Sequence, residues 1–483
     1  MEAQISRRVR PALAALIATA LFAPAVGARA AALPVTDQTL SCGVRLLAQR
    51  EPDTPLVAID VFIMTAGAPE DASKPGLAGL VARTLFRGTS NQTEETIADK
   101  VGLLGGSATA SWDRNFTQIK VLTQASQFSN AAYLISDILK NASVSNAAVG
   151  EAREEMLQEL QQSSDDIYLQ TYNQLRKKLY YGQRIATMPV GDPLVIADLT
   201  GSEARAFYRR YYTGDNIVVS VVGNVDPAQA ATEFSNDLID LTAHSPSRPA
   251  SIIPPSAVPL SSVVTVKSYR GDLNGGYVMV GYLVPGAGEP EYPAILLLNA
   301  LLGGMKTSLL FTNLREKQGL GYDTSSNYSE DVGLSDLTGY ILSSGDPAAP
   351  ASPLHGLRAA AHAESSEAGQ GASFTLVREA LVEQFKTLRS RPPSDAMLAR
   401  AKRFVIGSYL QRHERLLDRA YWLGFSEMAL TPLGGYRFDT GFSSAIDAVS
   451  ADDVLKVAQK YLSGGYVVSM VLPGNPNAGE VSK

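Results

Sequence analysis

An internal duplication constrains the fold of this chain more than any other feature. The apolar segment 218–222 ends the first half, and the apolar segment 467–471 ends the second. Each follows a helical pattern that starts after a capping hydroxyl residue, Thr200 or Ser450, carries acidic residues in its first turn and ends in tyrosine. Self-similarity over so long a period is typical of duplicated structural units. The sequence therefore predicts two related halves.

The opening segments of the halves also correspond. Each consists of a strand pattern, a Gly-Ala bend and a helical pattern that begins at proline. In order, these are 56–64, Gly67-Ala68 and Pro75 in the first half, and 276–283, Gly286-Ala287 and Pro293 in the second. Further strand patterns lie at 108–122 and 334–342, and long helical patterns lie at 146–179 and 394–417. This mixture predicts the α+β fold class.

A proline-rich segment marks the boundary between the halves. Residues 244–262 hold five prolines, which lack backbone donors and resist packing into a sheet or helix. We therefore expect an N-terminal domain at 36–243 and a C-terminal domain at 263–476, joined by this linker. Within the second domain, residues 346–373 are rich in Ala, Ser, Gly and Pro, which predicts a flexible insertion.

Residues 1–30 have the three parts of a secretory signal peptide. Basic residues precede an apolar run at 12–28, and a small-x-small cleavage pattern ends at Ala30. We expect export, to the periplasm in a bacterium, and the Arg7-Arg8 pair hints at the twin-arginine route. An uncleaved membrane anchor is the alternative, although Pro24 interrupts the run. No later segment is long and apolar enough to span a bilayer, so we expect no membrane association after cleavage.

Composition argues against several other classes of function. The formal net charge is −6, which disfavours binding to nucleic acid or to anionic lipid. Cys42 is the only cysteine, so neither an intrachain disulfide nor a thiolate metal cluster can form. The chain has only four histidines, and no Ser-His-Asp or Cys-His catalytic arrangement can be argued from them.

Residues 76–89 carry the most informative motif. They read Gly-Leu-Ala-Gly-Leu-Val-Ala-Arg-Thr-Leu-Phe-Arg-Gly-Thr, which resembles the zinc-motif helix of the pitrilysin/insulinase family of metallopeptidases, the inverzincins. That family has His-x-x-Glu-His between a similar start and end; the histidines hold zinc and the glutamate activates water. Here Gly79, Ala82 and Arg83 stand at the His, Glu and His positions. The resemblance therefore implies a noncatalytic member without zinc, because a guanidinium also repels a dication.

The family's third zinc ligand is a glutamate on a later helix, and its match here is Glu159. The family's other carboxylate on that helix falls on Ala152. With the family's fold, Arg83 and Glu159 face each other where zinc would lie, and a charge-assisted hydrogen bond ties the two helices together. An ordinary solvated helix carboxylate is the alternative for Glu159. We expect substitution of either residue alone to destabilise this half.

No other metal site is predicted. The matching helix of the second half, 293–302, holds no ligand, and the four histidines fit no His-x-x-Glu-His spacing. These are His244, His355, His362 and His413. His355 and His362 have the spacing of one helical face, but no carboxylate is fixed beside them, so we assign them no metal.

The second half keeps a different family feature. Residues 314–322 read Leu-Arg-Glu-Lys-Gln-Gly-Leu-Gly-Tyr, which looks like the family's Leu-Arg-x-x-x-Gly-Leu-x-Tyr segment. In the family, this Arg and Tyr project into the cavity opposite the zinc and help to hold substrate backbone. The resemblance implies that role for Arg315 and Tyr322. A helix salt bridge and a core tyrosine are the alternative reading of the two residues.

A third match lies at 105–111, Gly-Gly-Ser-Ala-Thr-Ala-Ser. It is similar to the strand along which the family binds substrate by adding a peptide to a sheet edge. The resemblance makes Ser107, Ala108 and Thr109 candidate substrate-binding residues. As a bare sequence, the segment suits any strand.

These matches run from Leu40 to Pro473 and imply the family's architecture. We expect two homologous halves, each a largely antiparallel β-sheet with helices packed on one side, arranged as a clamshell around a chamber. Some family members divide the work between a catalytic chain and an inactive one. We therefore predict a noncatalytic subunit of an exported zinc metallopeptidase, inactive alone and without a cofactor of its own. It would form a heterodimer with a zinc-carrying catalytic chain and offer a wall to peptide substrates. A metal-free peptide-binding or structural scaffold of the same fold is the alternative.

Overall fold

The computed structural model describes residues 34–65, 73–181, 186, 191–244, 260–344 and 367–474. The described residues from Val35 onward belong to one compact unit. Several predictions fall on residues outside these ranges. They are the signal peptide at 1–30, the Gly67-Ala68 bend, nearly all of the 244–262 linker, and the 346–373 insertion as far as residue 366, with His355 and His362. None of the helices in the described ranges combines the length and the apolar character needed to cross a membrane.

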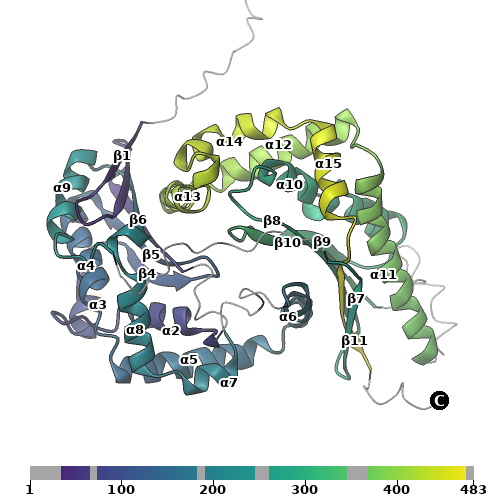
Figure 1. The fold of residues 1–483 in the computed structure, drawn as a ribbon, viewed down its shortest axis with the longest axis horizontal. Coiled ribbons are helices and arrows are strands. Elements are labelled where there is room, and N and C mark those ends of the chain that lie inside the picture. The colour runs from purple at the N-terminus through teal and green to yellow at the C-terminus, as the bar shows by residue number, and fades with distance from the viewer. Residues whose placement is uncertain are drawn as a thin grey trace, which may run out of the picture. The chain divides into compact units, whose positions relative to one another are not determined.

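The first half builds a six-stranded sheet with the order β1-β2-β6-β3-β5-β4 (Figure 1). The strands are β1 Val35–Thr39, β2 Arg45–Arg50, β3 Leu56–Met64, β4 Ser107–Trp112, β5 Phe116–Gln124 and β6 Ile217–Gly223. Only β2 and β6 run parallel, and the other neighbours are antiparallel. β3 lies in the interior of the sheet because its apolar, often β-branched residues are buried on both faces.

The second half repeats this plan with five strands in the order β7-β11-β8-β10-β9. The strands are β7 Val264–Arg270, β8 Gly276–Pro285, β9 Asp323–Tyr328, β10 Leu334–Ser343 and β11 Val467–Pro473. Only β7 and β11 are parallel. The order matches the first sheet from β2 to β4, so the predicted pair of homologous, largely antiparallel halves is confirmed.

Helices follow the strands in the same order in both halves. The first half has α2 Leu77–Thr84, α3 Glu94–Leu103, α4 Phe128–Asn141, α5 Asn146–Ser163, α6 Ile167–Leu179, α7 Pro193–Asp198, α8 Gly201–Tyr211 and α9 Pro227–Asp237. The second half has α10 Tyr292–Asn299, the π-helical segments η4 Ala300–Gly304 and η5 Leu310–Lys317, α11 Glu367–Ser390, α12 Asp395–Gln411, α13 Leu416–Ala429, α14 Tyr436–Ala448 and α15 Ala451–Tyr461. Short 3-10 turns lie at Ala125–Gln127, Gly214–Asn216 and Thr431–Leu433.

The predicted helix starts in the duplicated closing segments are confirmed. The Thr200 hydroxyl accepts from the Glu203 backbone N–H at the start of α8, and the Glu203 carboxylate accepts from the Thr200 backbone N–H, which completes a capping box. Ser450 and Asp453 form the same box at α15. Local sequence therefore determines where these two helices begin.

Three predicted elements are divided in the structure. The strand pattern at 108–122 is the hairpin β4–β5, because the Asp113 carboxylate accepts hydrogen bonds from the backbone N–H groups of Asn115 and Phe116 and turns the chain. The helical pattern at 146–179 breaks into α5 and α6 where Asp166 caps the second helix. The pattern at 394–417 also breaks, into α12 and α13, but α13 begins after Arg415 without a side-chain cap.

Each sheet is also covered by one helix from the other half. α13 packs against β3 and β6, and α6 packs against β8 and β11, on the face away from the half's own helices (Figure 1). The exchange is reciprocal: the Ser220 hydroxyl donates to the Ala420 carbonyl at 2.6 Å, and the Ser469 hydroxyl donates to the Thr171 carbonyl at 2.8 Å. The structure thus adds a second helical layer to the predicted sheet with helices on one side.

A buried ion network reinforces this exchange. Arg176 on α6 lies 2.7 Å from Asp336 on β10 and 3.1 Å from Asp331, and its side chain is only 2% exposed. The hydroxyls of Tyr172 and Tyr180 donate to Asp336. Buried charges are tolerated only when paired in this way. The network therefore ties α6 to the second sheet.

Candidate functional site

Helix α2 carries the degenerate motif and is held in place by its own apolar face. Leu77, Leu80, Val81 and Thr84 are buried with the spacing of one helical face. Gly76 begins the helix at φ 100°, a left-handed conformation that favours glycine. The motif positions of α2 are therefore fixed against their neighbours α5 and β4.

A tryptophan fills the space beside Gly79. A Cβ atom added to Gly79 would lie under 3.0 Å from three atoms of the Trp112 indole ring, at the end of β4. The Arg83 guanidinium stacks 4.7 Å from the centre of the same ring. Positions 79 and 83 are one helical turn apart and share a face. The face that would present two histidines in a zinc-binding member therefore packs on an indole ring.

The predicted pair between Arg83 and Glu159 is confirmed. The Arg83 guanidinium donates to the Glu159 carboxylate and also lies 3.5 Å from Glu155. The Arg83 side chain is 22% exposed and the Glu159 side chain is 51% exposed. Glu159 is therefore both paired with Arg83 and largely solvated, as the alternative of a solvated helix carboxylate expected.

The pair belongs to a ladder of alternating charges that joins α2, the bend after it and α5. Arg87, in that bend, lies 2.6 Å from Glu155 and 3.4 Å from Glu151 on α5, and 2.9 Å from Glu94 on α3. Partial burial opposes the charge of Arg87, but neighbouring carboxylates, Glu94 first, outweigh it and raise the pKa of the guanidinium. Three carboxylates of α5, those of Glu151, Glu155 and Glu159, are thus matched by permanent cations.

The residues present do not fit a zinc ion. Position 79 has no side chain, position 82 a methyl group and position 83 a cation, while Glu159 is engaged by that cation. Within the described ranges, no group of three or more His, Cys, Asp or Glu side chains is placed to hold a metal ion. The family's zinc site needs two imidazoles and a carboxylate. Of these three ligands, only the carboxylate is present here.

The two described histidines have local partners. His244 Nδ1 lies 2.5 Å from the Asp215 carboxylate. His413 lies between the Tyr409 carbonyl, at 2.8 Å, and the Asp439 carboxylate, at 3.2 Å. These contacts hold each imidazole against its own helix or loop, and neither histidine has the other beside it.

Strand β4, which carries Ser107, Ala108 and Thr109, lies at the edge of the first sheet. Ser107 and Thr109 are exposed and Ala108 is half-buried. Asp113 N donates to the Phe116 carbonyl, so in this antiparallel ladder the N–H of Ala108 points away from β5. Such an edge can pair with an added strand.

The corresponding edge strand of the second half is covered. A Cβ added to Gly303 in η4 would lie under 3.0 Å from the backbone of Ser326 in β9, so the helix backbone packs directly on that strand. The Ser326 hydroxyl also donates to the Asn299 carbonyl at 3.0 Å. Of these two edge strands, β4 is the one whose residues Ser107 and Thr109 are exposed.

The structure brings Arg315 and Tyr322 together at the end of η5. The Arg315 guanidinium stacks 4.3 Å from the Tyr322 ring centre and 4.8 Å from that of Phe311. Tyr322 is 79% exposed, so the alternative of a core tyrosine is wrong. Among the contacts of the described residues, none joins this pair to Arg83 or Glu159, so the structure brings the candidate residues together as two separate groups.

Sequence reasoning missed Trp112, Arg87 and Glu155. A hint was present for the tryptophan, because a glycine in the middle of a helix often marks the close approach of a large neighbour. The spacing of Arg83 and Arg87, four residues apart, likewise indicates two neighbouring cations that need acidic partners.

The chain has two related α+β halves and a motif helix packed on the first sheet. This arrangement places it in the class of peptidase-fold proteins. Its family is peptidase family M16, the insulinase family: the family model described as "Insulinase (Peptidase family M16)" matches residues 45–188, and the one described as "Peptidase M16 inactive domain" matches residues 198–404. The predicted membership of the pitrilysin/insulinase family is confirmed.

Similar proteins include several named as zinc proteases. An uncharacterized zinc protease of Bacillus subtilis (strain 168) is 22% identical over 90% of this chain and 97% of its own length. An uncharacterized zinc protease of Mycobacterium leprae (strain TN) is 25% identical over 60% of this chain, and the match spans 64% of that relative's length. The mitochondrial-processing peptidase subunit beta of Lentinula edodes is 23% identical over 89% of this chain and 88% of its own length.

Solved structures share the fold. A peptidase M16 inactive domain from Pseudomonas fluorescens has a TM-score of 0.75 at 19% identity, over 92% of this chain and 98% of that one. A protease from Helicobacter pylori also has a TM-score of 0.75, at 18% identity, over 91% of this chain and 100% of that one. At these identities the likeness concerns the fold alone.

Proposed function

We propose that this chain is a noncatalytic, metal-free subunit of an M16-type peptidase. The observation that carries the proposal is the Trp112 ring, which packs on Gly79 and stacks on Arg83 at the face where the family holds zinc. Removal of metal and general base leaves no group on α2 that can activate water. The isolated chain is therefore expected to have no peptidase activity.

The proposed contribution to the complex is a surface for peptides. The β4 edge offers the outward N–H of Ala108 to an extended peptide, and the exposed Arg315–Tyr322 stack offers a cation and a phenol to its backbone. Ala108→Pro removes only an outward N–H, whereas Thr109→Pro breaks the pairing with Lys120 on β5. Weaker peptide binding by Ala108→Pro with an unchanged melting curve would support the β4 assignment, and unchanged binding would refute it.

A partner that carries His-x-x-Glu-His completes the proposed enzyme. Support comes from the degenerate motif of this chain and from a relative whose printed name makes it a subunit of a peptidase. The proposed complex is a heterodimer with zinc in the other chain. The signal-like residues 1–30 support export and a periplasmic location.

The test is a reconstitution with three readouts. The chain without residues 1–30 is purified alone, and together with an M16 chain that carries His-x-x-Glu-His and is encoded beside it. Bound zinc, cleavage of a peptide library and molecular mass are then measured. We expect zinc and cleavage only with the partner, and faster cleavage by the pair than by the partner alone. Cleavage by the isolated chain would refute the proposal, and the absence of any gain on mixing would favour a metal-free scaffold.

A further inference from the structure

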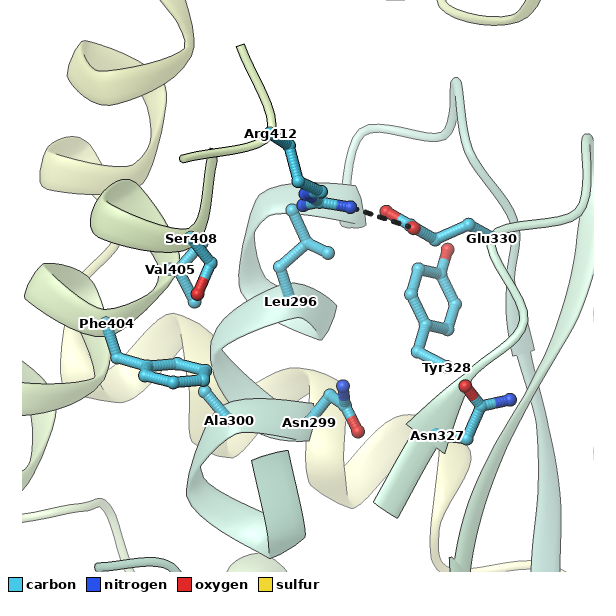
Figure 2. Close-up of a pocket in the computed structure, with 10 residues that line it drawn as sticks. All are labelled: Leu296, Asn299, Ala300, Asn327, Tyr328, Glu330, Phe404, Val405, Ser408 and Arg412. Carbon is cyan, nitrogen blue, oxygen red and sulfur yellow. Dashed lines mark ion pairs between the residues drawn. The ribbon is translucent and has the colours of Figure 1, made fainter. Parts of the chain in front are cut away.

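The second half contains a cavity of about 210 Å³ at the place that corresponds to the degenerate zinc site (Figure 2). It lies between α10 with η4, α12 and the end of β9. These elements correspond in order to α2, α5 and β4 of the first half. Where Trp112 and Arg83 fill the space in the first half, the second half leaves it open.

The walls of this cavity are chemically divided. One wall is apolar, with Phe404, which is 40% exposed, beside Leu296, Ala300 and Val405. The rest of the lining is polar and includes Asn299, Asn327 and Ser408. Arg412 and Glu330 approach each other across the opposite end, with 3.7 Å between nitrogen and oxygen (Figure 2). The cavity therefore joins one apolar wall to polar side chains and to one positive and one negative group.

Both charged groups are held in position by contacts outside the cavity. The Tyr292 hydroxyl donates to the Glu330 carboxylate at 2.8 Å, and Glu330 keeps a left-handed backbone, φ 51°, that is costly for a residue other than glycine. The Arg412 guanidinium stacks 4.8 Å from the Trp422 ring centre. A strained residue held in this way points to a role beyond packing.

The ion pair itself is weak enough to be replaced. The distance between the Arg412 nitrogen and the Glu330 oxygen is long for an ion pair, and the two side chains are 43% and 26% exposed. An exposed ion pair of this kind contributes little to stability. A ligand that brings its own carboxylate and ammonium can therefore form a better contact with each partner than they form with each other.

The geometry points to a binding site for one free α-amino acid with an apolar side chain. Its carboxylate would pair with Arg412, its ammonium with Glu330, and its side chain would enter the apolar part of the cavity. A cavity of about 150 Å³ holds benzene, so 210 Å³ has room for a leucine-sized molecule but falls below the roughly 300–1,000 Å³ of sites for larger ligands. This inference does not depend on the proposed peptidase role.

Isothermal titration of the whole chain with L-leucine tests the site. N-acetyl-L-leucine lacks the ammonium and L-leucinamide lacks the carboxylate, and we expect each to bind at least tenfold more weakly than L-leucine. Arg412→Gln and Glu330→Gln should each weaken L-leucine binding by tenfold or more. Arg403→Gln is the matched control because Arg403 is exposed on the same helix, and it should leave binding unchanged.

A second pair of variants separates loss of the site from loss of the fold. Ser408→Phe places a ring in the cavity, whereas Gly407→Phe, one residue earlier, projects into open space. We expect L-leucine binding to disappear only in the first variant, with equal circular dichroism for both. No binding by the unmodified chain, equal binding of the capped ligands, or equal loss in Arg403→Gln and Arg412→Gln would each overturn the proposal.

Discussion

The contact between Gly79 and Trp112 can be tested by Gly79→Ala. Whether this substitution raises or lowers the free energy of unfolding depends on the presence of the indole ring. Replacing a glycine inside a helix with alanine ordinarily stabilises a protein by about 1 kcal/mol. At position 79 the new methyl group meets the indole ring at under 3.0 Å, and overpacking of this kind costs about 1–3 kcal/mol. Gly79→Ala should therefore lower the free energy of unfolding by up to about 2 kcal/mol.

The same substitution should reverse its effect when the ring is removed. In a Trp112→Leu background the methyl group has room, so Gly79→Ala should stabilise by about 0.5–1 kcal/mol. Urea denaturation of the four proteins gives the coupling energy, which we expect to be about 1–3 kcal/mol. Gly150→Ala is the control, because Gly150 lies within α5 and a Cβ there meets no atom within 4 Å. If Gly79→Ala behaves like Gly150→Ala in both backgrounds, the ring does not occupy the zinc position.

Three further predictions follow from the site and its surroundings. The triple variant Gly79→His, Ala82→Glu, Arg83→His should bind zinc only when Trp112→Ala is added, because the indole ring otherwise blocks the first imidazole. Elemental analysis measures the bound zinc, and zinc in the triple variant alone would contradict the prediction. Glu159→Ala should lower the free energy of unfolding by less than about 1 kcal/mol, because Glu159 is 51% exposed and Arg83 keeps its contact with Glu155. Arg83→Met should lower it more, because it also removes the stack on Trp112. A larger loss for Glu159→Ala than for Arg83→Met in urea denaturation would contradict this prediction. Burial raises the pKa of Asp113 to about 7 although the residue keeps some solvent contact. The folded state therefore holds a proton that the unfolded state releases, and stability falls as pH rises from about 4 to 7. Asp113→Asn keeps the oxygen that accepts the turn hydrogen bonds, so it should remove part of this loss and be more stable than the parent at pH 8; parallel pH profiles of the urea midpoint would refute the assignment.

Local features of the fold could be predicted from the sequence, and long-range ones could not. β3 spans the predicted 56–64, and the hydroxyl caps at Thr200 and Ser450 start their helices, because neighbouring residues determine these signals. The hairpin turn at Asp113 was missed because its carboxylate was not read as a backbone acceptor. The exchange of α6 and α13 depends on residues far apart in the chain, and no local pattern encodes it.

The candidate site divides in the same way. The contact of Arg83 with Glu159 was predicted from the spacing of a known family motif, not from any property of either residue. Trp112 could not be placed opposite Gly79 without the sheet, since only the β4–β5 pairing brings the end of the strand over α2. The stack of Arg315 on Tyr322 required the path of the chain through the glycines between them, of which Gly319 has φ 62°.

The reciprocal exchange of α6 and α13 has a consequence for biosynthesis. While the chain is being made, one face of the first sheet stays bare until residues 416–429 have left the ribosome, because α13 is the helix that covers β3 and β6. A nascent chain in this state displays apolar surface for most of its synthesis, including Phe62 and Phe116, whose rings pack 5.0 Å apart beside α13 in the finished protein. We therefore expect a chain truncated before α13 to aggregate more readily than the whole chain, because its first sheet lacks this cover.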